Sequence, residues 1–396
     1  MKIHPQTLEG IQNELKRLHP QLLLDAFTDY EAREVLRDIL MTEHGTFLST
    51  DELLDHVVQE TVGLGIIETI IKDENVTDIS YNGTELIVNT NERKYTYEYE
   101  VTENYIVKLI QKFANAVGKE FTPKSPILDA TLSNLRLNAV HNSISPYGTT
   151  MALRASKAKL ALNEENFSDF APPYILDFFK DAIATRSNIV ISGETGTGKT
   201  ELQKLLVSMI PFDEKIAMVE DTIDSHIKDL FPDKDIHSWI TSQSTTHTDL
   251  IKAGLRNNPV WILVSETRGK EAYEMLQAVL SGHRIITTLH AVDARAIPKR
   301  FVNMMKMGYQ VDEESIKSDI YNYFQFGVHI EKTEIKGKVI RYLREIVEYQ
   351  ADGTALTVYE QKKEGDEIYG VVGKYSQDFA ERLKKYKRAN HFIGTT

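Results

Sequence analysis

Residues 193–200 read Gly-Glu-Thr-Gly-Thr-Gly-Lys-Thr, and the apolar stretch Asn188-Ile189-Val190-Ile191-Ser192 comes directly before them. The octapeptide fits the pattern G-x-x-x-x-G-K-S/T, in which backbone N–H groups of a glycine-rich loop surround phosphates at a helix N-terminus. The residues that follow repeat apolar side chains at helical spacing as far as Ile210, and Pro211 ends that pattern. This stretch therefore predicts a buried strand, a phosphate-binding loop and a helix, in that order.

The loop is expected to bind a nucleotide through both its backbone and its side chains. Lys199 is predicted to lie along the β- and γ-phosphates, and the Thr200 hydroxyl is predicted to ligate Mg²⁺. The expected nucleotide-binding residues are Gly193, Glu194, Thr195, Gly196, Thr197, Gly198, Lys199 and Thr200. The alternative interpretation of these residues is a glycine-rich turn with an exposed lysine.

Strands and helices alternate on the C-terminal side of this loop. Strands are predicted at 215–219, 260–264 and 284–289, with helices at 249–256 and 271–280 between them. Such alternation is typical of a parallel sheet with helices on both faces. The fold class expected from the sequence is therefore α/β.

Carboxylates follow two strands of this predicted sheet. Glu266 follows the apolar strand 260–264, and Glu220, together with Asp221, follows the strand 215–219. A parallel sheet presents ligand-binding groups at the carboxyl ends of its strands, so Glu266 is the expected catalytic carboxylate, and Glu220 and Asp221 are candidates to hold Mg²⁺ or polarise water. Each of them also fits an ordinary charged residue between a strand and a loop.

Two histidines, His283 and His290, bracket the strand 284–289. A neutral imidazole both donates and accepts a hydrogen bond, so either residue is a candidate for sensing the γ-phosphate or for moving a proton. A structural histidine is an equally good interpretation of His290.

The composition restricts the partners and the compartment. The chain has 396 residues, 46 Lys+Arg against 58 Asp+Glu, a net charge of −12 and no cysteine. The negative charge repels nucleic acid and anionic lipid at long range, and the lack of cysteine excludes disulfides and Cys-ligated zinc. Because the N-terminus is polar and no apolar run approaches the roughly 20 residues of a membrane span, a cytoplasmic protein is expected.

The order of predicted elements divides the chain into five segments. Residues 1–70 are expected to form a helical extension and residues 71–155 a small α/β domain in which Asn82-Gly83 turns a hairpin. Residues 156–182, with Pro172-Pro173, are the expected linker. The nucleotide-binding domain is predicted at 183–350, and strands with a basic helix at 351–396.

Four motifs in order resemble those of the secretion and pilus traffic ATPases, the type II/type IV secretion superfamily. They are the Walker A loop at 193–200, the Asp box at 219–222, the Walker B region at 255–269 and the His box at 281–291. Residues 76–83 and 125–140 resemble the branch with tight-adherence pilus and conjugation-type ATPases. The resemblance covers about residues 75–350.

The resemblance implies a RecA-like P-loop NTPase domain after a small α/β domain, with ATP and Mg²⁺ bound between the two. It also implies a homo-hexameric ring that works with inner-membrane platform or secretion-channel proteins. By the same resemblance Arg136 and Arg154 reach from the small domain toward the phosphates, and Arg268 is the arginine after the Walker B glutamate. Surface arginines on strands are the alternative for Arg136 and Arg154.

The sequence departs from the family pattern at two places. Glu201 replaces a second threonine after the loop, and Asn258-Pro259-Val260 lacks the usual aspartate, which leaves Glu266 and Glu220 to support the metal. Both departures keep open a nucleotide-binding assembly or regulatory component with weak hydrolysis. A RecA-like nucleic-acid motor is a further alternative, but it needs a basic or aromatic track that this acidic chain lacks, so no sequence-specific nucleic acid binding is expected.

The principal hypothesis is a Mg²⁺-dependent ATPase ring that powers a membrane-embedded secretion, pilus-assembly or conjugative transfer machine. The basic run Arg382 to Arg388 is a candidate for peripheral contact with the cytoplasmic face of a membrane. A solvated helix face is the alternative interpretation of that run.

Overall fold

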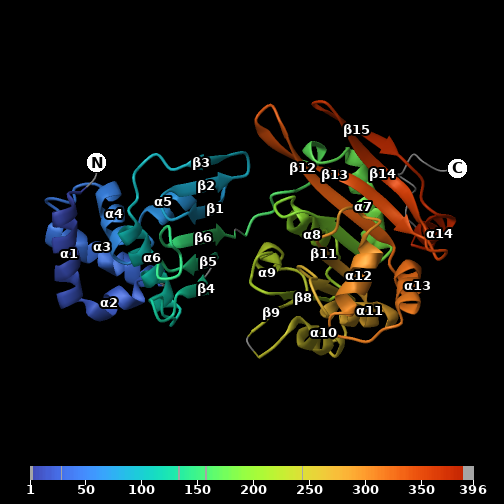
Figure 1. Ribbon diagram of the computed structural model, residues 1–396, viewed down its shortest axis with the longest axis horizontal. Coiled ribbons are helices and arrows are strands. Elements are labelled where there is room, and N and C mark those ends of the chain that lie inside the picture. Colours follow the sequence, from blue (N-terminus) through green and yellow to red (C-terminus); the bar gives the residue numbers. More distant parts are fainter. Residues whose placement is uncertain (1–2, 28, 133, 157, 243, 387–396) are drawn as a thin grey trace. The chain divides into compact units, whose positions relative to one another are not determined.

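The computed structural model describes residues 3–27, 29–132, 134–156, 158–242 and 244–386. The chain forms two compact units, Met1–Ser156 and Lys157–Thr396. Figure 1 shows the elements of each unit along the chain. Within the described residues, no helix combines the length and the apolar character that crossing a bilayer requires.

The first unit begins with helices that share a small core of their own. They are α1 (Pro5–Leu18), α2 (Pro20–Asp25), α3 (Tyr30–His44) and α4 (Asp51–Thr61), whereas α5 (Ile66–Ile71) packs into the core of the following sheet. Leu15, Leu36, Leu40 and Val57 are fully buried in this core. Polar caps set where two helices begin, because the side chain of Asp29 accepts from the N–H of Glu31 and that of Thr50 accepts from the N–H of Leu53.

An antiparallel sheet completes the first unit. In the described part of the chain its strand order is β3-β2-β1-β6-β5-β4, and α6 packs on it through Ile106, Leu109, Ile110 and Phe113. The elements are β1 (Val76–Tyr81), β2 (Leu86–Thr90), β3 (Lys94–Thr96), α6 (Glu103–Ala116), β4 (Ile127–Leu132), β5 (Leu135–Val140) and β6 (Thr150–Ala155). Asp78, Arg136 and Arg154 lie on the other face of the sheet, where side chains are partly or fully exposed.

A mixed sheet organises the second unit. Its order among the described strands is β15-β14-β13-β12-β7-β11-β10-β8-β9, parallel from β12 to β9 and antiparallel from β12 to β15. The strands are β7 (Ile189–Gly193), β8 (Ile216–Glu220), β9 (Ile236–Ile240), β10 (Trp261–Val264), β11 (Arg284–Leu289), β12 (Phe326–Ile335), β13 (Lys338–Tyr349), β14 (Ala355–Glu364) and β15 (Glu367–Val372). The predicted α/β fold with a parallel sheet is confirmed, and the antiparallel strands extend it.

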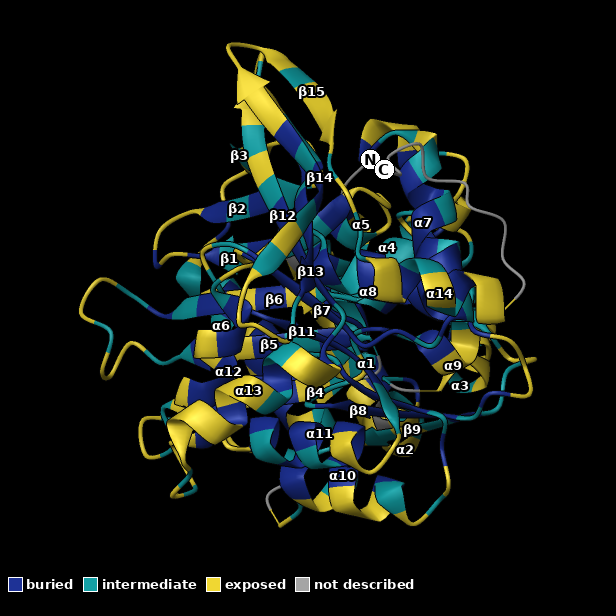
Figure 2. Ribbon diagram, turned by 90° about the vertical axis from the view of Figure 1, so that its right-hand side faces the viewer, coloured by how far each residue is buried: buried dark blue, intermediate teal, exposed yellow. Residues whose placement is uncertain are grey.

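Two hydrophobic cores lie on opposite faces of this sheet. Successive side chains alternate between them, since Ile189 and Ile191 belong to one core and Val190 to the other. The helices are α7 (Pro173–Ala184), α8 (Lys199–Ser208), α9 (Ile227–Leu230), α10 (His247–Leu255), α11 (Glu271–Leu280), α12 (Ile297–Met305), α13 (Glu313–Tyr323) and α14 (Gln377–Lys385). Burial on both faces explains the continuous apolar strands, whereas the distal parts of β14 and β15 are exposed (Figure 2).

The second unit extends beyond the nucleotide-binding segment expected from the sequence at both ends. Residues 156–182, the expected linker, contain the 3₁₀ turn η1 (Phe167–Asp169) and most of α7, and Phe167 and Phe178 are buried in the core. At the other end, β14 pairs with β13 and so continues the same sheet. Residue spacing alone did not indicate that residues 167–182 join this core, because their contacts, such as that of Gln361 with the Phe170 carbonyl, join segments far apart in the sequence.

The basic C-terminal segment is only partly a charged surface. Arg382 donates to the carbonyl of Thr185 at 2.6 Å and to the Ser187 hydroxyl at 3.1 Å, so it anchors α14 to the unit. Lys384 and Lys385 are exposed. The remaining basic residues of the run, Lys387 and Arg388, lie outside the described residues.

We expect Asn188→Ala to destabilise the second unit by about 2–3 kcal/mol, because unpaired buried polar groups each cost about 1–3 kcal/mol. The fully buried Asn188 side chain accepts from the N–H of Ile285 at 2.9 Å and donates to the carbonyl of Tyr323 at 2.8 Å. Both tryptophans, Trp239 and Trp261, belong to this unit, so urea unfolding followed by intrinsic fluorescence measures its stability.

The matched control is Asn257→Ala, because the Asn257 side chain is only partly buried and donates to the carbonyl of Ala253 at the surface. We expect this variant to stay within about 0.5 kcal/mol of the parent. Equal stability of the two variants would contradict the bridging role of Asn188.

Candidate functional site

The glycine-rich loop joins β7 to α8 in a conformation that glycine makes possible. A Cβ on Gly193 would lie 2.5 Å from the carbonyl oxygen of Ile330 on β12, closer than real Cβ contacts. Gly198, which precedes the first turn of α8, has φ +97°, in the left-handed region that favours glycine. The loop therefore approaches β12 closely and enters α8 through a conformation that another residue would strain.

Lys199 is the charged group at the centre of the loop. Its side chain is largely buried, and its ammonium group donates to the carbonyl oxygens of Gly193 and Glu194, both at 2.9 Å. Burial lowers the pKa of Lys199 to about 8; the charge of Glu266 opposes this shift, and those of Arg268 and Lys332 add to it. A bound phosphate would stabilise the protonated form, so the site favours an anionic ligand.

Glu266 lies just beyond the carboxyl end of β10, where two cationic or donor groups meet it. Its Oε2 accepts from Arg268 Nη2 at 2.8 Å, and its Oε1 lies 3.1 Å from His290 Nε2. Burial raises the pKa of Glu266, but Arg268, together with the charges of His290 and Lys199, outweighs burial and brings it below the usual value. Glu266 is therefore ionised at neutral pH, the form that accepts a proton or binds a metal.

Asp221 and Glu220 have different surroundings although they are adjacent in the sequence. Glu220 is almost fully buried and accepts from both the N–H and the hydroxyl of Ser225 at 2.9 Å, so its carboxylate shapes the following turn. Burial raises its pKa, and these hydrogen bonds only partly oppose that shift. Asp221 instead lies 3.4 Å from Arg268 Nη1 and 3.4 Å from His247 Nε2.

The structure thus connects Asp221, rather than Glu220, to Glu266 through Arg268. The sequence indicated Asp221 only as a strand-end carboxylate beside Glu220, and it indicated no role for His247. The spacing of His247 from the motifs carried no signal, because its contact with Asp221 depends on where α10 begins.

The two predicted histidines lie at opposite ends of β11. His290 follows its last residue and contacts Glu266, whereas His283 precedes its first residue, Arg284. A strand of this length separates its ends by about 20 Å at 3.3 Å per residue. The structure therefore brings His290, and not His283, to the edge of the sheet where the glycine-rich loop begins.

The carboxylate of Glu201 is turned to the segment that precedes α7. It accepts from the N–H of Ala161 at 3.0 Å and from the ammonium group of the buried Lys204 at 2.9 Å. Lys204 also donates to the carbonyl of Lys159 at 3.2 Å. Since a cation and a backbone N–H neutralise Glu201, this departure from the family pattern does not place a bare negative charge at the loop.

Arg136 and Arg154 form a cationic pair on the first unit. They are directly opposite in the antiparallel register of β5 and β6, so their side chains share one face of the sheet. Arg154 Nε donates to Asp78 at 3.1 Å, and Arg136 lies 3.7 Å from Asp129. Both side chains are well exposed, at 39% for Arg136 and 51% for Arg154, and are thus accessible to an anionic ligand.

The donor set at the loop fits Mg²⁺ held together with phosphate oxygens. Among the described residues, no three His, Asp or Glu side chains gather into a metal site of their own. Mg²⁺ commonly takes one or two protein oxygens and completes its coordination with substrate phosphates and water. The hydroxyl of Thr200 and the carboxylate of Glu266 are the hard oxygen ligands that such a site requires.

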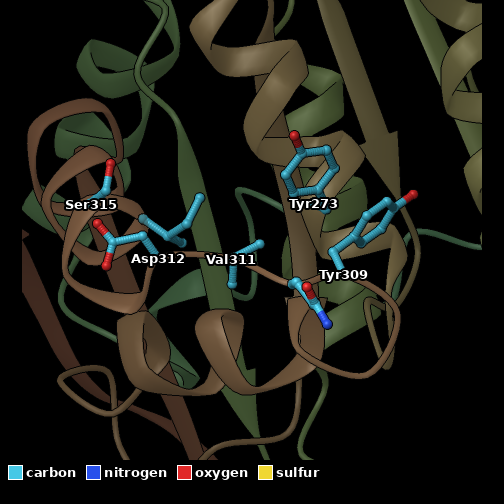
Figure 3. A pocket seen from close by; sticks show the side chains of 7 residues that line it. Tyr273, Tyr309, Val311, Asp312 and Ser315 are labelled. Carbon is cyan, nitrogen blue, oxygen red and sulfur yellow. The ribbon is translucent and has the colours of Figure 1, made fainter.

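A separate cavity of the second unit lies between α11 and the beginning of α13. Figure 3 shows the side chains that line this cavity of about 230 Å³, among them Tyr273 of α11 and Tyr309 after α12. Their rings stack at 4.3 Å, and the Tyr309 hydroxyl donates to Glu274 at 2.7 Å. None of its lining residues belongs to the loop or to the cluster around Glu266.

A family model described as "Type II/IV secretion system protein" matches residues 60–321. An uncharacterized protein of Bacillus anthracis is 50% identical over 96% of this chain and 90% of its own length. The type IV secretion system protein VirB11 of Brucella suis is 24% identical over 68% of this chain and 84% of its own length.

The ATPase DotB of Yersinia pseudotuberculosis shares the fold, with a TM-score of 0.53 and 15% identity over 82% of each chain. These comparisons confirm the predicted superfamily resemblance. The tight-adherence branch stays a prediction.

The charges around Lys199 predict how its reactivity depends on pH. We expect an amine-acylating reagent to label Lys199 with a midpoint near pH 8, whereas an ordinary lysine has a midpoint near 10.4. Arg268→Gln removes a positive neighbour and should raise the midpoint, and Glu266→Gln removes a negative neighbour and should lower it. Peptide mass spectrometry measures the labelling. A lower midpoint in Arg268→Gln or a higher midpoint in Glu266→Gln would contradict this electrostatic assignment.

Proposed function

The chain belongs to the type II/IV secretion system protein family, and on that premise we propose that it is a Mg²⁺-dependent ATPase. We propose further that it assembles as a hexameric ring, beside inner-membrane platform or secretion-channel proteins, at the cytoplasmic face of a secretion, pilus-assembly or conjugative machine. The observation that carries the proposal is the convergence of Lys199, Glu266, Arg268 and His290 at the carboxyl ends of β7, β10 and β11.

Each of these residues has a definite part in phosphoryl transfer to water. Lys199 neutralises the β- and γ-phosphates, and Thr200 and Glu266 would hold Mg²⁺, which offsets phosphate charge when bound. Glu266, kept ionised because its pKa is held below the usual value, orients the attacking water and accepts its proton as that water attacks. His290 Nε2 lies 3.1 Å from Glu266 Oε1 and is proposed to restrict the direction of the carboxylate.

Arg268 is the residue whose partners are expected to change during turnover. Without a phosphate it bridges Glu266 and Asp221, which together neutralise its charge. A γ-phosphate offers it a stronger acceptor, and movement of Arg268 toward that phosphate releases one oxygen of Glu266 for the attacking water. The same guanidinium then stabilises negative charge on the transferring group.

The exposed pair Arg136 and Arg154 is proposed to couple hydrolysis to movement of the first unit. A guanidinium that arrives with a domain makes catalysis depend on the position of that domain. The acidic partners Asp78 and Asp129 hold the two side chains on the sheet until a more highly charged phosphate replaces them.

A nucleotide-binding regulatory component with weak hydrolysis is the second candidate. It is favoured by the contacts of Glu266, because Arg268 and His290 occupy one carboxylate oxygen each. If a machine partner is required to move Arg268, the isolated chain binds ATP and turns it over slowly.

The decisive measurement is the ATPase rate per subunit as a function of protein concentration. We expect the rate to rise with concentration as rings assemble, and to fall by about 100-fold or more in Lys199→Ala and Glu266→Gln. The control Glu313→Gln alters an exposed carboxylate on α13 and is expected to keep the parent rate. Tight ATP binding with a negligible rate at every concentration would select the regulatory candidate.

A second prediction concerns the first unit. Arg136→Gln or Arg154→Gln is expected to lower kcat by about 100-fold or more, as loss of an arginine that stabilises the transition state does, with a smaller change in KM. Arg93→Gln removes an exposed arginine of the β2–β3 turn on the same unit and serves as the control. A parent-like kcat in both variants would show that these arginines do not take part.

A further inference from the structure

The hairpin β12–β13 extends past the end of the strand that leads into the glycine-rich loop. β12 pairs with β7 only as far as Ile330 opposite Gly193, but it continues beside β13 to Ile335. Lys336 and Gly337 both have positive φ, as a two-residue type I′ turn requires, and the register is regular from Ile330 to this turn, after a shift between His329 and Ile330. Its outer half therefore lies beside the loop, and Figure 1 shows it projecting beyond the parallel strands.

Two cations of this hairpin donate to the backbone of the loop. Lys332 Nζ donates to the carbonyl of Thr195 at 2.7 Å, and Arg341 Nε donates to the carbonyl of Gly196 at 2.9 Å. Lys332 and Arg341 are directly opposite in the β12–β13 register and so share one face of the hairpin. Neither belongs to residues 60–321, which the family model matches.

The placement of Lys332 opposite Arg341 lowers the stability of the hairpin. Like charges directly opposite in an antiparallel pair are destabilising. The neighbouring carboxylate of Glu331 is engaged with Tyr342 and Arg344, and adjacent strand residues point to opposite faces. The carbonyls of the loop are thus the acceptors that compensate the two like charges.

The peptide bond explains what such contacts do to the loop. In a trans peptide the C=O of one residue and the N–H of the next point in opposite directions, and the described residues contain no cis bond. Holding the carbonyls of Thr195 and Gly196 toward the hairpin therefore directs the N–H groups of Gly196 and Thr197 to the other side. Those N–H groups are the ones that surround phosphates in loops of this pattern.

We infer that Lys332 and Arg341 are positioning residues for the polyphosphate of a nucleoside di- or triphosphate. They hold the loop with its N–H groups directed at the phosphates, and they add two positive charges beside it. With Lys199 on the carbonyls of Gly193 and Glu194, cations then hold four successive carbonyls of the loop. The inference rests on the proposed function, because it assumes that the loop binds a nucleotide.

The test measures binding of a fluorescent ATP analogue and of ADP to the full chain. Lys332→Gln and Arg341→Gln are each expected to raise Kd by about tenfold, and the double variant by about a hundredfold, as loss of charged hydrogen bonds does. The effect on ADP is expected to match that on ATP, because the loop surrounds the β-phosphate. In turnover, KM should rise more than kcat falls.

Lys338→Gln is the matched control, since Lys338 is an exposed lysine on the same hairpin with the same charge. It is expected to bind ATP within twofold of the parent. Lys332→Arg and Arg341→Lys keep the charge and are expected to recover most of the affinity. If the double variant has a lower melting temperature, Lys332→Gln carries the test alone, because the Lys332 side chain is exposed.

The outcomes separate this inference from the proposed function. Parent-like binding by the double variant, while Lys199→Ala binds poorly, would overturn the inference and leave the proposed function intact. An equal loss in Lys338→Gln would also overturn it, since the effect would then be general charge. A folded parent that binds neither ATP nor ADP would overturn both.

Discussion

The contact between Gly193 and β12 determines how the whole site is built. With a Cβ only 2.5 Å from the carbonyl of Ile330, no side chain fits at this position, and the first residue of the loop therefore lies directly on the backbone of β12. That contact joins the parallel half of the sheet to its antiparallel half at the point where the loop begins. It also decides which side chains of the hairpin reach the loop, because register fixes the face of every residue beyond Ile330.

Around this loop, positive and negative groups alternate from one side of the site to the other. The charge of Glu266 raises the pKa of Lys199 against the effect of burial, and Glu266 also pairs with Arg268. Arg268 pairs in turn with Asp221, which lies 3.4 Å from His247. These groups are coupled. A phosphate that attracted Arg268 would leave Glu266 and Asp221 with one cationic partner fewer. The two pKa values are lowered for different reasons: burial lowers that of Lys199 against the charge of Glu266, whereas for Glu266 burial acts upward and Arg268, His290 and Lys199 outweigh it.

The motif residues were predictable because their chemistry depends on local order. A glycine-rich loop between a strand and a helix forms from neighbouring residues, and Glu266 and His290 were predictable as groups that follow buried strands. The same local reasoning did not indicate the surroundings of Glu220 and His283. The turn after β8 engages Glu220, and His283 lies at the opposite end of its strand from His290.

The α/β class, the loop, the order of the motifs and the carboxylate at the end of β10 follow from the sequence alone, because strand and helix periods and a contiguous phosphate-binding motif are local properties. Three features required the folded chain: the contacts of Arg268 and His247 with Asp221, the neutralisation of Glu201, and the hydrogen bonds of Lys332 and Arg341 to the loop. Contacts such as that of Lys332 with Thr195 join residues more than a hundred positions apart. The order of strands in the sheet creates them, and that order is set by packing of the complete core.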